Sequence, residues 1–223
     1  MDIGLWMDQY VKTVCAEFGS RVVFLGLQGS QARGEATAES DIDAVAIFDH
    51  VDADTLRAYR DVCRRLPESE KLCGFVCGQK ELDRWPAEDL IGLMLDTLCF
   101  HGSLEYLGVR LSPEVARAHV LMCAGNLYHM CAQAIFLDKP CKWLRKQALF
   151  TLRAHHYCQS GMFVHAFGEL LLWCEEEDAA VFDCDADKEA ETFLSFASRL
   201  IQLYGKDDYI PPCPSCGDHH EHH

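Results

Sequence analysis

The chain carries little positive charge for its length. Its 223 residues include 20 Lys and Arg against 35 Asp and Glu, so the formal net charge is −15, and basic residues nowhere form a run. A surface this acidic repels the phosphate backbone of nucleic acids. We therefore expect no DNA or RNA partner, whereas a cationic small molecule or a basic protein face would be attracted over a long range.

We also expect no segment that targets the chain to a membrane or for export. Asp2 and Asp8 stand where a signal peptide needs basic residues, and no apolar run approaches the roughly 18 residues of a membrane span. The 13 cysteines are odd in number and scattered singly, which is typical of buried free thiols rather than of a disulfide framework. The sequence predicts a cytoplasmic protein without membrane contact.

The hydrophobic content of 49% is enough for a substantial core, and its periodicity divides the chain in two. The first part, residues 1–110, is predicted to contain helices over 2–18, 52–69 and 86–98 and strands over 21–29, 41–49 and 71–78. The second part, residues 111–206, has four long segments with apolar residues at three- and four-residue steps, which predicts a helical bundle. The expected fold class is α+β, a small mixed β-sheet with flanking helices followed by an all-α bundle.

The stretch Gly26 to Asp43, GLQGSQARGEATAESDID, carries the strongest functional signal. Gly29 and Ser30 end the first predicted strand, where backbone N–H groups and the serine hydroxyl would point at an anion. Asp41 and Asp43 project from one side of the second predicted strand, about 7 Å apart at the backbone. Mg²⁺ prefers one or two such carboxylates, with waters and substrate phosphates completing its shell. The stretch therefore suits a nucleoside triphosphate with its Mg²⁺.

This combination resembles the signature of the DNA polymerase beta-like nucleotidyltransferase superfamily. The matching residues are Gly29, Ser30, Gly34, Ser40, Asp41 and Asp43. The layout of the whole chain is similar to that of antibiotic nucleotidyltransferases, which modify aminoglycosides or lincosamides, and of bacterial proteins that pair a minimal nucleotidyltransferase domain with a HEPN-like bundle. The resemblance implies transfer of a nucleoside monophosphate, often AMP, from an NTP bound with Mg²⁺ or Mn²⁺ to a hydroxyl, with release of pyrophosphate.

The resemblance also implies roles for individual residues. Asp41 and Asp43 would hold the metal and act in catalysis. The phosphates would be bound by Gly29, Ser30, Arg33 and Ser40, although a structural role for Arg33 is equally open.

Active members of the superfamily add a third carboxylate on a later strand, and the predicted strand KLCGFVCG, residues 71–78, contains no acid. Three acids farther along the chain are candidates for the missing base: Glu81, Glu88 and Asp96. We expect Asp96 to take this role, because the segment around it shows no solvated face that would explain an acid.

The helical half offers candidates for an acceptor pocket. Trp143, His155, His156, Tyr157 and Trp173 could line it, although aromatics at helical spacing are more often core. The acidic cluster 175–178 could attract a cationic acceptor or simply be a solvated helix end. No Arg is followed four to six residues later by His, so the ribonuclease motif of HEPN-like bundles is absent.

Several alternatives stay open at this point. The acceptor could be a small molecule, or the hydroxyl of a partner protein as in toxin–antitoxin pairs, or the domain could bind nucleotide without transferring it. The helical half could also form a homodimer interface. The last residues, 207–223, contain Cys213, Cys216 and four histidines and are predicted to be a disordered tail that binds metal adventitiously.

Overall fold

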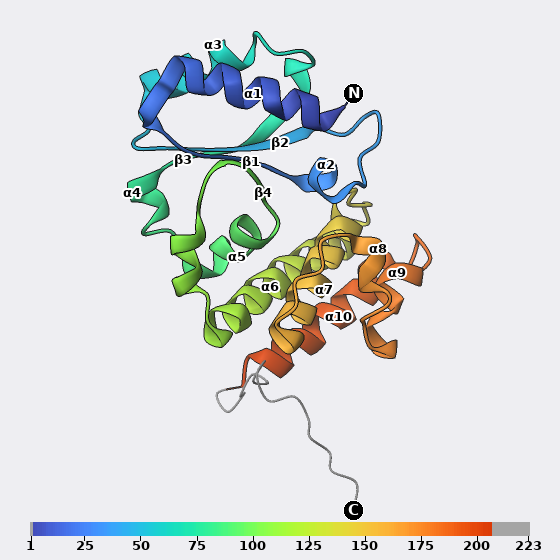
Figure 1. The fold of residues 1–223 in the computed structure, drawn as a ribbon. Helices are drawn as coiled ribbons and strands as arrows, with labels where there is room; N and C mark the ends of the chain where they lie inside the picture. Colours follow the sequence, from blue (N-terminus) through green and yellow to red (C-terminus); the bar gives the residue numbers. More distant parts are fainter. Residues whose placement is uncertain (1, 207–223) are drawn as a thin grey trace, which may run out of the picture. The chain divides into compact units, whose positions relative to one another are not determined.

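A computed structural model describes residues 2–206 and divides into two compact units (Figure 1). The first unit ends at Arg110 and the second begins at Leu111. The predicted metal-binding tail, residues 207–223, lies outside the described residues.

A four-stranded mixed sheet forms the centre of the first unit. Its strands are β1 (Val22–Gln28), β2 (Ile42–Phe48), β3 (Leu72–Gly78) and β4 (Leu98–Gly102). The order is β3-β2-β1-β4, in which β1 is antiparallel to both of its neighbours and β2 is parallel to β3. The sequence predicts the first three strands but not β4, an edge strand whose Leu98 and Cys99 are exposed, so it lacks an apolar alternation. The α+β fold class is confirmed.

Helices cover both faces of the sheet. They are α1 (Ile3–Phe18), α3 (Ala53–Cys63), α4 (Gln79–Leu82) and α5 (Ala87–Leu95), with short 3₁₀ turns at Gly19–Arg21, Ser69–Lys71 and Glu105–Arg110. Ala44 and Ala46 of β2 pack in the core with α1 and α3, while Val45 and Ile47 pack in the core with α4 and α5 (Figure 1). Because side chains alternate along a strand, Asp43 points to the same face as Val45 and Ile47.

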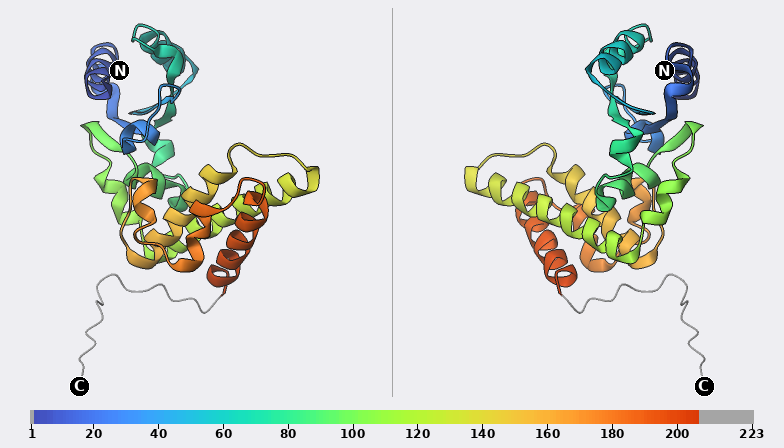
Figure 2. Two further views of the ribbon diagram at one scale, coloured as in Figure 1. Left: turned by 90° about the vertical axis from the view of Figure 1, so that its right-hand side faces the viewer. Right: turned by 90° about the vertical axis from the view of Figure 1, so that its left-hand side faces the viewer.

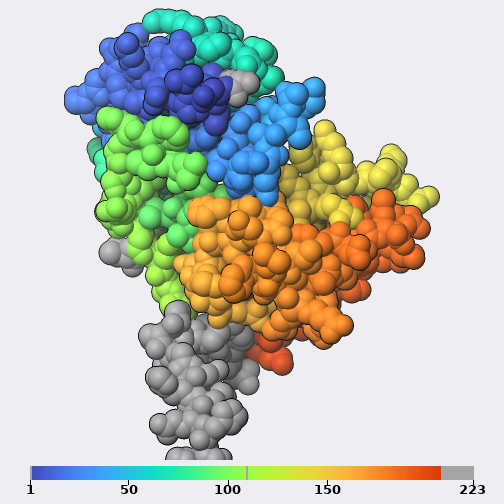
Figure 3. Space-filling model, turned by 45° about the vertical axis from the view of Figure 1, so that its right-hand side comes forward, coloured from blue at the N-terminus to red at the C-terminus, as the bar shows by residue number. Residues whose placement is uncertain are grey.

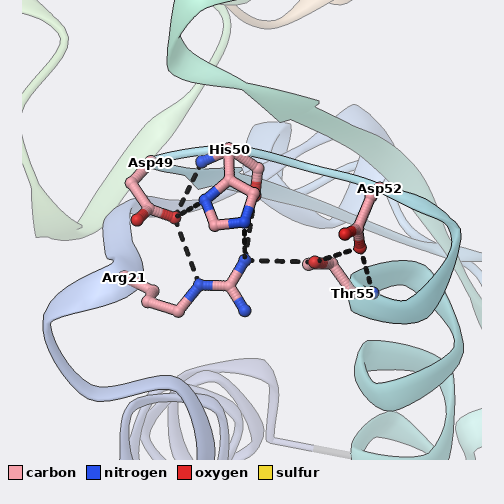
Figure 4. Close-up of polar contacts among 5 residues, drawn as sticks. All are labelled: Arg21, Asp49, His50, Asp52 and Thr55. Atoms are coloured by element: carbon pink, nitrogen blue, oxygen red, sulfur yellow. Dashed lines mark hydrogen bonds and ion pairs between the residues drawn. The ribbon is translucent and has the colours of Figure 1, made fainter.

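A polar cluster at the far end of the sheet is structural. Arg21 donates from Nε to Oδ1 of Asp49 at 3.2 Å and from Nη2 to the hydroxyl of Thr55 at 3.0 Å (Figure 4). Asp52 caps α3 by accepting from the Thr55 backbone N–H at 2.7 Å, a bond that lowers the pKa of its carboxyl group. Since Val22 pairs with Phe48 here, this cluster lies at the opposite end of β2 from Asp43.

The second unit is helical. Its helices are α6 (Pro113–Leu137), α7 (Leu144–Ser160), α8 (Phe167–Leu170), α9 (Ala180–Asp183) and α10 (Glu189–Tyr204), with a 3₁₀ turn at Glu176–Asp178. The long helix α6 packs against α7 and α10 (Figure 2). One of the four predicted long helical segments, residues 163–177, does not form a long helix, because only the four residues of α8 are α-helical there and Leu171, Leu172 and Trp173 are exposed.

One helix passes a test for membrane spans that averages hydropathy instead of requiring an unbroken apolar run. The 25-residue helix α6 is long and apolar enough to cross a membrane by length and composition alone, with a mean hydropathy of 1.4 over its best window. Uncharged polar residues such as Asn126 and Gln133 interrupt its apolar runs without lowering the average much.

A buried polar network ties α7 to α10 and to the turn at Glu176–Asp178. Nδ1 of His155 lies 2.6 Å from the Tyr204 hydroxyl, and Nε2 of His155 lies 3.4 Å from Oδ2 of Asp178, which also pairs with Arg199. A neutral imidazole satisfies both contacts, because Nδ1 accepts from the tyrosine and the Nε2 proton is donated to the carboxylate. Burial, with help from Arg199, lowers the pKa of His155 to about 4.

This network predicts a loss of stability in mild acid. The folded pKa of His155, about 4, is below its ordinary value of 6.5, so its contribution is complete above pH 6.5 and is lost as the pH falls toward 4. The loss is on the order of 3 kcal/mol. We expect thermal unfolding to show a smaller drop over this range in His155→Gln than in the wild type. His129→Gln, at an exposed position, is the control; equal drops in all three proteins would contradict the prediction.

Candidate active site

Asp43 and Gly29 lie directly against each other. Gln28 pairs with Asp43 in the antiparallel ladder between β1 and β2, and Gly29 follows Gln28 with a left-handed φ of 73°. A Cβ atom built on Gly29 would overlap the Asp43 carboxylate. Glycine is therefore required here for two reasons, the backbone conformation and the close approach of the carboxylate.

The short helix α2 (Gly29–Arg33) continues this turn and is held on both sides. Before it, Nε2 of Gln28 donates to the carbonyl oxygen of Gly92 in α5 at 3.2 Å. After it, Gly34 adopts a left-handed φ of 72°, and the backbone N–H of Glu35 donates to the carbonyl oxygen of Ser30 at 2.9 Å. Ser30 is therefore fixed beside Gly29 at the end of β1.

The loop that leads into β2 carries Ser40 and Asp41. Asp41 is exposed and lies immediately before β2, two residues from Asp43. The Ser40 hydroxyl accepts from the backbone N–H of Thr37 at 2.9 Å, which shapes the loop. Lys71, just before β3, donates from Nζ to the carbonyl oxygen of Ala38 at 3.1 Å. The sequence alone gave no reason to place Lys71 beside this loop, because the contact depends on how the strands pair.

Comparison with known proteins agrees with this geometry. Residues 7–87 match the family model for the nucleotidyltransferase domain. This part of the chain is a nucleotidyltransferase domain. The match covers the glycine turn, the loop and both aspartates, so the predicted nucleotidyltransferase family is confirmed for this part of the chain.

A solved structure extends the likeness over both units. The spectinomycin adenyltransferase AAD(9) from Enterococcus faecialis, crystallised with ATP and spectinomycin, superposes with a TM-score of 0.57 at 10% sequence identity, covering 89% of this chain and 98% of that chain. At this identity the likeness shows a shared fold. The resemblance of the helical half to HEPN-like bundles is not confirmed, and no curated protein sequence matches the chain significantly.

The strand next to Asp43 in the nucleotidyltransferase domain presents a cysteine where an acid was expected. β3 runs parallel to β2, and Cys73 is the partner of Asp43 in the register. Partners in register share a face of the sheet, and the next residues on that face, Phe75 and Cys77, pack with Val45 as expected. Cys73 is exposed. The sequence alone does not reveal this position, because Cys73 lies beside Asp43 only as a result of the register between β2 and β3.

The three acids proposed as a base lie at different places, and one of them, Glu81, lies away from Asp43. The Glu81 carboxylate lies against Gly78, at the last residue of β3, whereas Cys73 is the second residue of that strand. Glu81 is therefore at the other end of the sheet. Glu88 lies in the first turn of α5, about two turns before Asp96.

The third acid, Asp96, is buried and paired with Arg33. Nη1 of Arg33 donates to Oδ2 of Asp96 at 3.3 Å, and its Nε donates to Oε2 of Glu35 at 2.8 Å. The side chains of Arg33 and Asp96 are only 3% and 8% exposed. The ion pair joins the end of α2 to the end of α5, so it holds the glycine turn of the nucleotidyltransferase domain in place.

Removing the guanidinium should therefore destabilise the domain. We expect Arg33→Met to lower the free energy of unfolding by roughly 3 kcal/mol, because a buried carboxylate loses its cation. The control is Arg57→Met, which breaks an ion pair with Asp54 whose side chains are 64% and 89% exposed. That exposed pair should be worth less than about 1 kcal/mol. Equal effects of the two substitutions in urea unfolding would show that the buried pair has no special role.

The residues present suit a divalent cation that is shared with a substrate. Within residues 2–206, no group of three or more His, Cys, Asp or Glu side chains is placed to hold a metal on its own. Asp41 and Asp43 offer two carboxylates, and the second of them lies against Gly29 of the glycine turn. This donor set fits Mg²⁺, which takes one or two carboxylates and completes its octahedron with waters and phosphates.

The residues predicted to line an acceptor pocket differ in burial within the helical unit. His155 and His156 are buried in α7, whereas Trp143 and Trp173 are 55% and 57% exposed. An open cavity of about 450 Å³ in this unit has a different lining: Tyr128, Leu194, Ser195, Ser198, Arg199 and Gln202. The two tryptophans are therefore surface residues whose exposure needs another explanation.

Proposed function

We propose that the protein transfers a nucleoside monophosphate, with AMP as the favoured group, from a Mg²⁺-bound nucleoside triphosphate to a hydroxyl of a small molecule such as an antibiotic. One observation carries this proposal, the contact of the Asp43 carboxylate with Gly29 at the end of β1. It joins the residue expected to hold the metal to the turn expected to hold the phosphates. The nucleotidyltransferase family match over residues 7–87 supports the same reaction.

The reaction balances without a further co-reactant. The acceptor oxygen attacks the α-phosphorus and forms a new P–O bond, while the bond from that phosphorus to the bridging oxygen of the β-phosphate breaks. Pyrophosphate leaves, and the hydroxyl proton goes to solvent. Such displacements depend mainly on positioning and on neutralising the phosphate charge.

The chain's own residues would position the triphosphate. Gly29 lets a phosphate approach the backbone closely, and the Ser30 hydroxyl adds a donor beside it. Ser40 and the loop before β2 would border the same phosphates. Asp41 and Asp43 would hold the Mg²⁺, which when bound neutralises negative charge on the phosphates.

Asp96 is better suited to positioning than to proton transfer. Its carboxylate is bound by Arg33, and the pair fixes α2 behind the glycine turn. We propose that both residues act through this turn, in place of the base role for Asp96 and the phosphate contact for Arg33. If so, Asp96→Asn should lower kcat and stability together while the shape of the pH–rate profile is unchanged. Loss of one limb of that profile would instead identify Asp96 as the base.

The expected acceptor is cationic. The net charge of −15 attracts cations at long range and repels anionic acceptors. The structural neighbour was crystallised with spectinomycin, an antibiotic, and its likeness covers both units of this chain. These two observations together favour a positively charged antibiotic as the acceptor over the terminal hydroxyl of a nucleic acid.

A screen for pyrophosphate release tests this function. The protein is incubated with Mg²⁺, each of the four nucleoside triphosphates, and a panel of cationic and neutral hydroxylated antibiotics. We expect release that requires both ATP and one cationic acceptor, with the acceptor gaining the mass of AMP. If AMP is instead found attached only to a co-purifying protein, the result would favour a protein acceptor.

One observation favours a second candidate, a module that binds nucleotide without transferring it. Cys73 stands beside Asp43 where a third carboxylate was expected on β3. Under this alternative, ATP and Mg²⁺ bind but pyrophosphate is not released with any acceptor. Cys73→Glu separates the two candidates, because it should create activity in a binding module and should not be needed in an enzyme that is already active.

A further inference from the structure

An exposed apolar and basic surface lies where α6 ends and α7 begins. We call this surface the basic tip and define it by Phe136, Leu137, Lys139, Lys142, Trp143 and Lys146. Phe136 is 87% exposed, Leu137 51% and Trp143 55%. The Nζ atoms of Lys142 and Lys146 lie 4.7 and 5.7 Å from the centre of the Trp143 ring. The end of α6 projects beyond the neighbouring helices of its unit (Figure 2).

The three lysines of the basic tip have no acidic partner among the described residues. Only Arg145, which is part of the same turn of chain, is neutralised, by an ion pair of 2.6 Å with Glu189. In a chain with a net charge of −15, three unneutralised lysines around an exposed tryptophan are unusual. Monomeric proteins rarely expose apolar side chains in such a group unless a partner covers them.

A second surface of the same unit has the opposite charge and a similar apolar content. We call it the acidic segment and define it by Leu171, Leu172, Trp173, Glu175 and Glu176. Leu171 is 50% exposed, Leu172 79% and Trp173 57%. Glu175 and Glu176 are exposed and have no basic partner among residues 2–206, whereas the next acid, Glu177, pairs with Arg199 at 3.6 Å. Figure 3 shows the stretch between α7 and α10 (orange) on the surface of the helical unit.

The two surfaces are separated along the bundle and do not neutralise each other within one chain. Arg145 lies beside the basic tip, while Asp178, two residues after the acidic segment, contacts His155. Arg145 and His155 are ten residues apart on α7, which corresponds to about 15 Å of helix. Among residues 2–206, the lysines of the basic tip form no ion pair with the glutamates of the acidic segment.

We propose that the helical unit forms a homodimer in which the basic tip of each chain docks on the acidic segment of the other. Each surface offers an exposed tryptophan with aliphatic neighbours, and each offers unneutralised charges of the sign that the other needs. In an antiparallel two-fold arrangement both contacts form at once, since the tip of each copy faces the segment of its partner. Apolar side chains would form the centre of each contact and the ion pairs its rim.

The net charge of the protein makes this contact selective. Two copies that each carry −15 repel one another over most of their surfaces. The basic tip is one place where lysines gather without acidic partners, so an acidic surface of a second copy can approach there without repulsion. Charge complementarity of this kind determines partner and register more than it raises affinity.

Charge reversal on the full-length protein tests the proposal by sedimentation velocity. One variant carries Lys142→Glu and Lys146→Glu, and a second carries Glu175→Lys and Glu176→Lys. In either variant alone, like charges meet at both contacts, and we expect the dissociation constant of the dimer to rise by about 100-fold or more. In an equal mixture, each tip meets a segment of opposite charge, so a heterodimer should form again with the mass of two chains.

The control has the same net-charge change as the Lys142→Glu/Lys146→Glu variant, but in the other unit. Lys12→Glu and Lys80→Glu replace two exposed lysines of the nucleotidyltransferase domain, and this variant should dimerise like the wild type. Recovery in the mixture also shows that the variants are folded. A wild type that stays monomeric, or a mixture that fails to reassociate, would overturn the proposal. Wild-type monomers that bind vesicles of anionic lipid through the tip would overturn it too, and would identify a membrane surface as the partner.

Discussion

Replacement of Asp43 by Asn is expected to lower the rate of nucleotidyl transfer by about 10³-fold or more without destabilising the protein. The change removes one charge from the metal site and so forfeits several kcal/mol of charge neutralisation on the phosphates. Stability should be kept, because Asn has the same shape and the change relieves repulsion between the carboxylates of Asp41 and Asp43. The measurements are pyrophosphate release with saturating ATP and acceptor, and the melting temperature.

The matched control is Asp8→Asn on the exposed face of α1. It removes the same charge far along the chain from the site and should leave the rate within about twofold, because exposed charges are screened by salt. An Asp43→Asn protein that keeps more than a tenth of the wild-type rate would mean that the reaction does not depend on this carboxylate.

Replacement of Gly29 by Ala is expected to abolish activity for a related reason. The new Cβ would overlap the Asp43 carboxylate, so the carboxylate must move out of the site. The left-handed φ of 73° adds a strain of about 1 to 2 kcal/mol for a residue with a Cβ. Metal-dependent nucleotide binding should be lost together with turnover.

The chain provides a control that separates strain from displacement. Gly34 has almost the same left-handed φ, 72°, but a Cβ built on it meets no atom within 4 Å. Gly34→Ala should therefore lower the melting temperature about as much as Gly29→Ala while most of the activity remains. If both variants lost activity equally, loop strain rather than the position of Asp43 would be responsible.

Local patterns in the sequence predict much of the first unit. The apolar runs around β1, β2 and β3 and the alternation in β2 place Asp43 on its correct face. The glycine turn is also predictable, because Gly29 and Gly34 have conformations that few other residues adopt. These features depend on residues that are close together along the chain.

Features that depend on strand pairing could not be predicted in this way. The position of Cys73 beside Asp43 follows from the parallel register of β2 and β3, which no local pattern encodes. The ion pair between Arg33 and Asp96 joins residues 63 positions apart. Arg33 was predicted to bind phosphate and Asp96 to act as the base, whereas in the structure they form a buried ion pair with each other.

In the helical unit, local apolar spacing predicts more helix than the structure contains. Its periodicity predicts α6, α7 and α10, but the same apolar spacing over 163–177 predicts a helix that does not form. Apolar spacing forms a helix when the apolar face can be buried. Here Phe167 and Leu170 are buried, while Leu171, Leu172 and Trp173 remain on the surface that we assign to a partner chain.

The most direct test is the binding of ATP to the wild type and to the Asp41→Asn/Asp43→Asn variant, with and without Mg²⁺, by isothermal titration. If Asp41, Asp43 and the Gly29 turn hold a metal-bound triphosphate, the wild type should bind ATP tightly only with Mg²⁺, and the variant should lose this dependence while keeping its fold. ATP binding that is equally strong in both proteins, or absent from the wild type with Mg²⁺ present, would contradict the proposed site.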